Sequence, residues 1–193
     1  MITHLRGRLI DKNPTYAVIE TNGVGYWLNI SLNTYTQLPD SEEVFLYTHL
    51  YIKEDGHTLF GFGTRMEREL FRLLISVSGV GPSIARTMLS SMSPEEIQHA
   101  IASGEVGIIQ SVKGIGLKTA QRVIVDLKDK ISKTYAVDEV SIGESNTNKN
   151  EALSALEVLG FAKKQSEKVI DKILLEDPTI SVEALIKSAL KIL

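Results

Sequence analysis

The first sixty residues alternate between apolar and polar positions with the two-residue period of β-strands. Five runs rich in β-branched and aromatic residues are separated by turn-forming pairs such as Asn13-Pro14, Asn22-Gly23 and Asp55-Gly56. The pattern predicts strands over 2–10, 16–21, 25–30, 44–53 and 58–62, and a short helix over 32–38. Five strands and one small helix in this length predict a compact barrel of the OB type over residues 1–63.

From residue 64 the apolar period becomes that of helices. Thr64 and Glu67 have the spacing of a capping box, and so do Ser93 and Glu96, with Pro94 at the first helical position. Further helices are expected around 105–112 and from Gly114-Ile-Gly116 to about residue 132. Residues 64–135 are therefore predicted to be an all-helical domain.

One stretch of this helical domain occurs twice. Residues 76–89 and 111–124 match at an offset of 35 residues. The identical pairs are Ser76/Ser111, Val77/Val112, Gly79/Gly114, Gly81/Gly116 and Ala85/Ala120. Each copy runs from an apolar segment through Gly-apolar-Gly into a segment of helical period, so each predicts two helices joined by a tight glycine turn.

Such a turn exposes the first backbone N–H groups and the positive end of its exit helix, which suits a phosphate. Val80 and Ile115 would be buried as anchors, and the turn offers nothing that reads a base, so the expected ligand is nucleic-acid backbone. A single copy is as consistent with an ordinary helix connection. Two copies, with Lys118 and Arg122 beside the second, favour DNA binding and resemble tandem helix-hairpin-helix motifs. Two joined hairpins can be related by a pseudo-two-fold axis and grip both strands across one minor groove.

The C-terminal third changes character again. Residues 136–150 are polar and aperiodic, which predicts a flexible linker. Beyond it, residues 151–193 predict a three-helix, UBA-like bundle with helices over 151–159, 163–174 and 182–192. A small tethered bundle is typical of a docking module. The sequence does not say which apolar residues of the bundle form its core and which form a docking face. The candidates are Leu156, Leu159, Phe161, Leu185, Ile186 and Leu190. The predicted fold class is therefore α+β and multidomain.

Composition narrows the possibilities. A hydrophobic fraction of 43% and a charged fraction of 23% are ordinary for a soluble protein. The absence of cysteine excludes disulfides and thiolate metal sites. No signal pattern or membrane-length apolar run is present, so we expect a cytoplasmic protein with no membrane association. The net charge is −3, yet residues 63–130 hold nine Lys and Arg against seven Asp and Glu, which favours a local DNA-binding face.

The predicted barrel contains two features open to a functional interpretation. The acidic pair Glu54 and Asp55 falls at the tip of the last hairpin. The most favoured interpretation of this pair is a solvated turn. The second is a pin that repels DNA, by roughly 3 kcal/mol per carboxylate–phosphate pair at about 6 Å and an effective dielectric near 20. The third is the metal-binding pair of a nuclease. Eight aromatic residues could stack on bases, but little basic charge accompanies them, so core or subunit-interface positions are favoured. These are Tyr26, Trp27, Tyr35, Phe45, Tyr47, Tyr51, Phe60 and Phe62.

The order of barrel, tandem hairpins, linker and helical tail resembles the RuvA family of Holliday-junction-binding proteins. The resemblance covers the whole chain and rests on short motifs: Leu5-Arg6-Gly7, Gly23-Val-Gly-Tyr26, Lys53-Glu54-Asp55, Leu59-Phe-Gly-Phe62, Gly79-Val-Gly-Pro82, Gly114-Ile-Gly116 with Lys118-Thr-Ala120, Ala155-Leu156 and Leu159-Gly160-Phe161.

The resemblance implies a non-catalytic subunit of a branch-migration helicase complex, acting in DNA recombination, DNA repair and the SOS response. It implies a homotetramer, or an octamer on DNA, that holds a four-way junction open and square-planar. Glu54 and Asp55 match the family's acidic pin. The tail would bind the RuvB ATPase, and the RuvC resolvase would act on the same junction. No cofactor is implied, and the chain has no Gly-x-x-x-x-Gly-Lys-Ser/Thr phosphate loop.

The candidate DNA-backbone contacts lie on the two hairpins. They are Gly79, Val80, Gly81, Ser83 and Arg86 in the first, and Gly114, Ile115, Gly116, Lys118, Thr119 and Arg122 in the second. The family often carries Lys where this chain has Ser83 and Leu117. Fewer cationic contacts would flatten the salt dependence of binding, and Arg86 is a candidate to compensate.

Two other classes of function are consistent with the hairpins alone. A helix-hairpin-helix glycosylase would need a catalytic Asp in a larger helical domain, and Asp126 follows Gly116 too closely for that role. A nuclease would need clustered acids or a His, whereas His4, His49, His57 and His99 are scattered. A protein-interaction adaptor would use the hairpins only as structure, which loss of DNA binding in Lys118→Glu would exclude.

Overall fold

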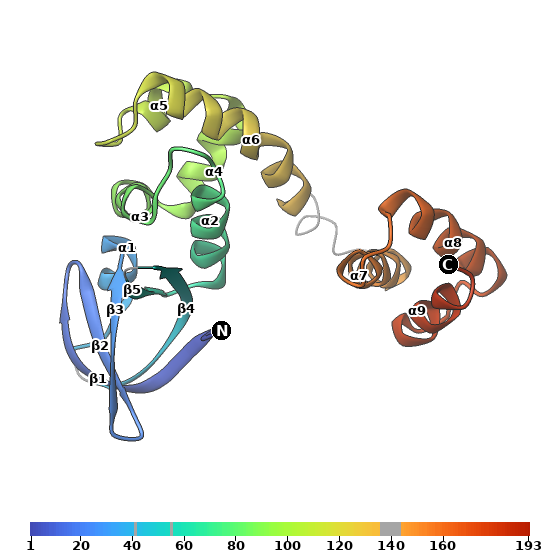
Figure 1. Ribbon diagram of the computed structural model, residues 1–193, viewed down its shortest axis with the longest axis horizontal. Coiled ribbons are helices and arrows are strands. Elements are labelled where there is room, and N and C mark those ends of the chain that lie inside the picture. Colours follow the sequence, from blue (N-terminus) through green and yellow to red (C-terminus); the bar gives the residue numbers. More distant parts are fainter. Residues whose placement is uncertain (41, 55, 136–143) are drawn as a thin grey trace. The chain divides into compact units, whose positions relative to one another are not determined.

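The computed structural model of the 193-residue chain describes residues 1–40, 42–54, 56–135 and 144–193. The chain divides into two compact units, Met1–Tyr135 and Ala136–Leu193. The first unit contains a β-barrel and the helices α2 to α6, and the second contains α7 to α9 (Figure 1). Within the described ranges, no helix is both long enough and apolar enough to cross a membrane.

The N-terminal strands close into a barrel with the order β1-β2-β3-β5-β4. The strands are β1 His4–Asn13, β2 Tyr16–Thr21, β3 Val24–Ile30, β4 Glu43–Lys53 and β5 Gly56–Phe62. Neighbours are antiparallel except β3 and β5, which pair in parallel at Asn29↔Phe60 and Ile30↔Gly61. The short helix α1, Leu32–Gln37, precedes β4. The predicted OB-type barrel is confirmed, because alternation places every second residue inside a closed sheet, although β1 begins and ends two to three residues later than predicted.

The barrel aromatics divide into buried, partly buried and exposed groups. Phe60 and Phe62 are buried and join the core of the helical region. Four tyrosines are partly buried and pack against one of the two cores: Tyr26, Tyr35, Tyr47 and Tyr51. Trp27 and Phe45 are the exposed members, and each already stacks on a neighbour, Tyr16 and His4 respectively. Most of the aromatic residues are therefore used in packing.

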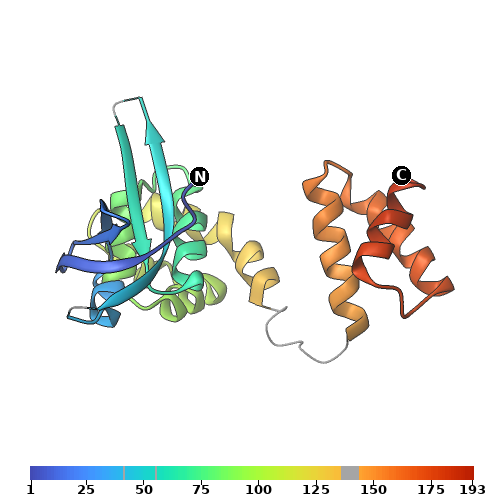
Figure 2. The same ribbon diagram turned by 90° about the horizontal axis from the view of Figure 1, so that it is seen from below.

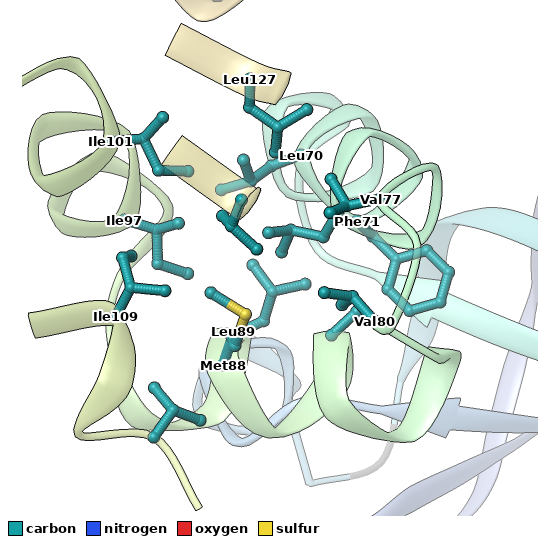
Figure 3. Close-up of a cluster of buried hydrophobic side chains, with 14 of the residues drawn as sticks. Leu70, Phe71, Val77, Val80, Met88, Leu89, Ile97, Ile101, Ile109 and Leu127 are labelled. Atoms are coloured by element: carbon teal, nitrogen blue, oxygen red, sulfur yellow. The ribbon is translucent and has the colours of Figure 1, made fainter. Parts of the chain in front are cut away.

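Five helices follow the barrel: α2 Arg65–Ile75, α3 Pro82–Ser91, α4 Pro94–Ser103, α5 Val106–Gln110 and α6 Leu117–Tyr135. Their apolar faces meet in one core, part of which Figure 3 shows. Leu70, Met88 and Ile97 come from three different helices and are 0–2% exposed. This single core holds both copies of the repeated stretch, so the spacing of the two turns is set by packing.

The two predicted capping boxes differ in the structure. At α4 both halves form, because the Ser93 side chain accepts from Glu96 N and the Glu96 side chain accepts from Ser93 N. At α2 the Thr64 hydroxyl accepts from Glu67 N at 3.1 Å, but the Glu67 carboxylate turns to the barrel. It accepts hydrogen bonds from the hydroxyls of Ser31 and, at 2.7 Å, Thr34 on α1. Burial raises the pKa of Glu67, and the two hydroxyl donors oppose part of that shift.

Polar contacts also tie the helices to the barrel. Arg68 donates to the carbonyl of Thr3 at 2.9 Å. On α3, Nη1 of Arg86 donates to the carbonyl of Thr15 at 3.2 Å and to Oδ1 of Asn29 at 3.1 Å. The barrel and the hairpins, predicted as separate domains, therefore belong to one packed unit.

The second unit is a bundle of α7 Glu144–Val158, α8 Lys163–Glu176 and α9 Val182–Leu190. Helix α7 begins at Glu144, so the prediction of a linker over 136–150 is wrong for residues 144–150, and 136–143 lie outside the described residues. Low apolar content in the first turns of α7 hid the helix, because a polar helix lacks the 3.6-residue signal. Asn148 there donates to the carbonyl of Ile180 at 3.3 Å, a tertiary contact that a linker would not make.

The bundle separates the six candidate docking residues. Leu156 and Leu185 are fully buried and belong to the core of the bundle. Phe161 and Ile186 are partly buried against the same core. Leu159 and Leu190 are 57% and 42% exposed. Other apolar side chains on the surface of the bundle were not in the predicted set: Val158, Leu175 and Ile192.

Candidate nucleic-acid interface

The first hairpin joins α2 to α3 through residues 76–81. The entry helix closes with Ser76 N bonded to the carbonyl of Arg72, and Val80 N then bonds to the carbonyl of Val77 at 3.0 Å. Gly79 has φ +96°, in the left-handed region that favours glycine. Val80 is 4% exposed, which anchors the turn in the helical core. Burying a side chain of this size stabilises the turn by roughly 1.5–3 kcal/mol.

The second hairpin, residues 111–116 between α5 and α6, repeats this geometry. Ile115 N bonds to the carbonyl of Val112 at 3.1 Å, and Gly114 has φ +95°. Ile115 is 6% exposed and fills the place that Val80 fills in the first copy. Each copy therefore contains one glycine turn with a buried apolar anchor, as predicted.

Both exit helices present backbone donors that the helix does not use. The first i→i−4 bond of α3 runs from Ala85 N to the carbonyl of Gly81 at 3.0 Å, and the same bond in α6 runs from Ala120 N to Gly116 at 2.9 Å. The amides that precede these two residues have no acceptor within their own helix. Gly81 and Gly116 are exposed, and a Cβ built on either would meet nothing within 4 Å. Each turn is therefore open at the positive end of a helix, a geometry that suits an anion.

The two turns lie beside each other and are related by a local two-fold axis. A Cβ built on Gly79 would lie 3.6 Å from Oγ1 of Thr119, and a Cβ built on Gly114 would lie 3.8 Å from Cγ1 of Ile84. Ile84 and Thr119 are themselves equivalent at the 35-residue offset. Each turn thus packs against the exit helix of the other at the same position, as a two-fold axis requires. Two adjacent turns of this kind would suit two phosphates of one DNA segment.

The predicted cations occupy different places around these turns. Lys118 and Arg122 are exposed on α6, and Nη1 of Arg122 donates to the carbonyl of Ser78 in the first hairpin at 3.1 Å. Arg122 therefore adds charge to the first turn although it belongs to the second copy. Arg86 is turned toward the barrel, where Thr15 and Asn29 accept its Nη1 hydrogens. Ser83 is exposed at the start of α3, and Leu117 is 51% exposed at the start of α6.

The β4–β5 hairpin extends beyond the body of the first unit (Figure 2). Its strands pair up to Lys53↔Gly56, and Glu54 is exposed at the turn. Asp55, the second residue of the predicted pin, lies outside the described residues. Among the residues that are described, no three His, Asp or Glu side chains gather into a candidate metal site.

Sequence reasoning missed the barrel residues that adjoin the first hairpin. Asn29, Tyr51, Lys53 and Thr58 line a cleft whose opposite wall is the first turn of α3. The predicted strands contain these residues, but an alternating pattern does not say which helix will pack beside a strand. Only the register of β3, β4 and β5 brings them to α3.

A closed five-stranded barrel joined to two two-fold-related turns defines an OB-barrel protein of the tandem helix-hairpin-helix class. Comparison with known families agrees over three successive regions. Residues 1–61 match the RuvA N-terminal domain, 71–129 match a SAM-like helix-hairpin-helix tandem, and 147–193 match the RuvA C-terminal domain.

Full-length relatives extend this agreement to the whole chain. A protein from Christiangramia forsetii is 64% identical over 191 residues, and one from Flavobacterium psychrophilum is 61% identical over 191 residues, each alignment covering 99% of both chains. A protein from Coxiella burnetii is 41% identical over 196 residues, covering 99% of this chain and 97% of its own. All three are described as the RuvA subunit of the Holliday junction branch migration complex. The chain belongs to the RuvA family.

Proposed function

We propose that this protein binds four-way DNA junctions through their backbone phosphates, without reading sequence. The observation that carries the proposal is the pair of two-fold-related turns, each with a left-handed glycine and helix amides that have no intrahelical acceptor. Amide donors contact phosphate oxygens and carry no base information. The names of the relatives add the kind of DNA, since they are described as Holliday junction subunits.

The preference for a junction over linear duplex is proposed to come from the β4–β5 hairpin. Glu54 is exposed there, and Asp55 follows it in the sequence. A carboxylate about 6 Å from a phosphate is repelled by roughly 3 kcal/mol at an effective dielectric near 20. The pair would therefore disfavour continuous duplex at this point and tolerate the open centre of a four-way junction. Held in this way, the junction would be open and square-planar.

The protein is proposed to act as a scaffold and not as an enzyme. A homotetramer, or an octamer enclosing the junction, would surround the crossing point in the cytoplasm. The second unit would bind the RuvB ATPase, which would supply the motor for branch migration in recombination, repair and the SOS response. RuvC would cleave the same junction. The proposal for RuvB is supported by two apolar side chains on the surface of the bundle, Leu159 and Leu190.

A competition assay tests the proposal. The intact protein is titrated onto a labelled four-way junction in the presence of unlabelled linear duplex of equal length, with and without Mg²⁺. We expect a strong preference for the junction and no cleavage. Equal affinity for the two DNAs would refute junction recognition, and Mg²⁺-dependent cleavage would refute the scaffold.

Two variants assign the roles within that assay. Glu54→Gln/Asp55→Asn removes the two charges and keeps the side-chain shapes, so it should bind linear duplex more tightly than the wild type. Lys118→Glu places a negative charge beside the second turn and should weaken binding to both DNAs. An unchanged duplex affinity in the first variant would remove the pin from the explanation.

A further inference from the structure

The first hairpin differs from the second in having the barrel beside it. A cleft of about 300 Å³ separates the first turn of α3 from strands β3, β4 and β5. Lys53 and Thr58 line it from the β4–β5 hairpin, and Ser83 and Arg86 line it from α3. The second hairpin has Gln121 at the position equivalent to Arg86, 35 residues later. The cleft therefore breaks the local two-fold symmetry.

Among the residues that the structure describes, the lining of this cleft carries only positive charge. Its described lining contains two cationic side chains, Lys53 and Arg86, and no Asp or Glu. Arg86 is held through Nη1 by two neutral acceptors, the carbonyl of Thr15 and Oδ1 of Asn29. A guanidinium has five N–H donors, so three, on Nε and Nη2, have no acceptor among the described residues. Lys53 lies over the ring of Tyr51, with Nζ 5.5 Å from its centroid, and has no ion-pair partner in the same described part of the chain.

The geometry suits an oxyanion that enters from solvent. The two hydrogen bonds from Nη1 orient the guanidinium of Arg86 without neutralising its charge. The donors on Nε and Nη2 are then placed for bidentate contact with a phosphate. The exposed Ser83 and the free amide end of α3 border the same space. Lys53 and Gly56 are the last paired residues before the turn that carries Glu54, so the cleft runs along the hairpin up to this acidic turn. A DNA strand held there would be one that passes the proposed pin.

We propose that this cleft binds a backbone phosphate of the strand that turns away from the crossing point of the junction, with Arg86 and Lys53 as its two cationic contacts. The inference rests on the proposed junction binding and adds a site outside the two glycine turns. It also explains how the first hairpin acts without a cation at position 83, where the second hairpin has Lys118 at the equivalent position. Arg86, one helical turn further along α3, supplies the charge from the cleft side.

The test measures salt dependence on two DNAs with the intact protein. Arg86→Met, Lys53→Met and the double variant are compared with the wild type for a four-way junction and for linear duplex across a range of KCl concentrations. Each single variant should reduce the slope of log K against log salt for the junction, and the double variant should reduce it by about 0.9, the contribution of one neutralised phosphate. The slope for linear duplex should stay unchanged, because no strand turns past the pin there. Arg65→Met, which removes an exposed cation outside the cleft, measures the effect of charge alone.

A second measurement locates the phosphate. Neutral methylphosphonates replace single phosphates next to the crossing point of the junction. One such replacement should weaken wild-type binding most, weaken Arg86→Met and Lys53→Met less, and leave the double variant Arg86→Met/Lys53→Met unaffected, because only the double variant has lost both cationic contacts to that phosphate. Thermal unfolding of each variant separates this effect from the hydrogen bonds that tie Arg86 to the barrel.

The outcomes are distinguishable. A wild-type protein without junction preference overturns the proposed function and the cleft site together. Junction preference with unchanged slopes in both variants overturns the cleft site alone. A lower slope confined to Arg86→Met, accompanied by a lower melting temperature and no methylphosphonate effect, makes Arg86 only a clamp and also overturns the site.

Discussion

The two glycines of one hairpin turn should respond to substitution in opposite ways. Gly79 has φ +96°, and a Cβ placed on it would lie 3.6 Å from Oγ1 of Thr119, an ordinary contact distance. Space is therefore available, and the cost of Gly79→Ala is the backbone strain of a left-handed residue. We expect a loss of about 1–2 kcal/mol in the free energy of unfolding. Gly114→Ala, at φ +95°, should cost the same.

Gly81 is the matched control within the same turn. Its φ of −83° and ψ of 168° are extended values that any residue adopts, and a Cβ on it would meet nothing within 4 Å. It is the N-cap of α3, where Ser is preferred, so Gly81→Ser should leave stability unchanged or raise it by a few tenths of a kcal/mol. The new hydroxyl would accept a hydrogen bond from a backbone amide in the first turn of α3 and would occupy the place where a phosphate is proposed to bind. DNA binding should fall without any loss of stability.

Urea unfolding and junction binding, measured on both variants, check these expectations. Gly79→Ala should lower the urea midpoint, whereas Gly81→Ser should lower only the affinity for DNA. Wild-type stability in Gly79→Ala would refute the assignment of strain to the turn. Wild-type affinity in Gly81→Ser would show that the amide end of α3 is not where phosphate binds.

Three further predictions concern other parts of the chain. Burial raises the pKa of Glu67, so the contribution of its protonated form to stability is complete below the ordinary carboxyl pKa and is lost as the pH rises through the raised pKa. Urea unfolding of Glu67→Gln should therefore not show this loss of stability with rising pH. Leu156→Ala, which truncates a buried side chain, should destabilise the second unit by about 2–5 kcal/mol in thermal unfolding. Leu159→Ala, at an exposed position, should leave the melting temperature unchanged and weaken the binding of RuvB in a pull-down. Lys118→Glu should lower the salt slope of binding to junction and duplex alike, and a change confined to one DNA would contradict its role at the turn.

The sequence by itself determined the local elements of this protein. Alternation over the first sixty residues specified the barrel strands, because a strand with one buried face must place apolar residues at every second position. The repeat at 35 residues specified two glycine turns with Val80 and Ile115 as anchors. These are short-range features, set by backbone conformation and by the periodicity of the chain.

Where short-range signals were weak or ambiguous, the sequence misled. The first turns of α7 are polar, so 144–150 were predicted as linker although they are helical. The spacing of Thr64 and Glu67 predicted a full capping box, but the carboxylate binds Ser31 and Thr34 instead. The carboxylate accepts hydrogen bonds from two hydroxyls that are distant in the sequence, in place of the amide at the start of its own helix. Sequence spacing cannot predict this choice of donor.

Only the tertiary structure decided which long-range neighbours meet. It placed Gly79 against Thr119 and Gly114 near Ile84, so the two copies of the repeat form a two-fold-related pair of turns. It brought Arg86 to Asn29, 57 residues away in the chain, and so formed the cleft beside the β4–β5 hairpin. The physical reason is that core packing and strand register, which depend on the whole chain at once, set these distances, whereas periodicity reports only which face of an element is buried.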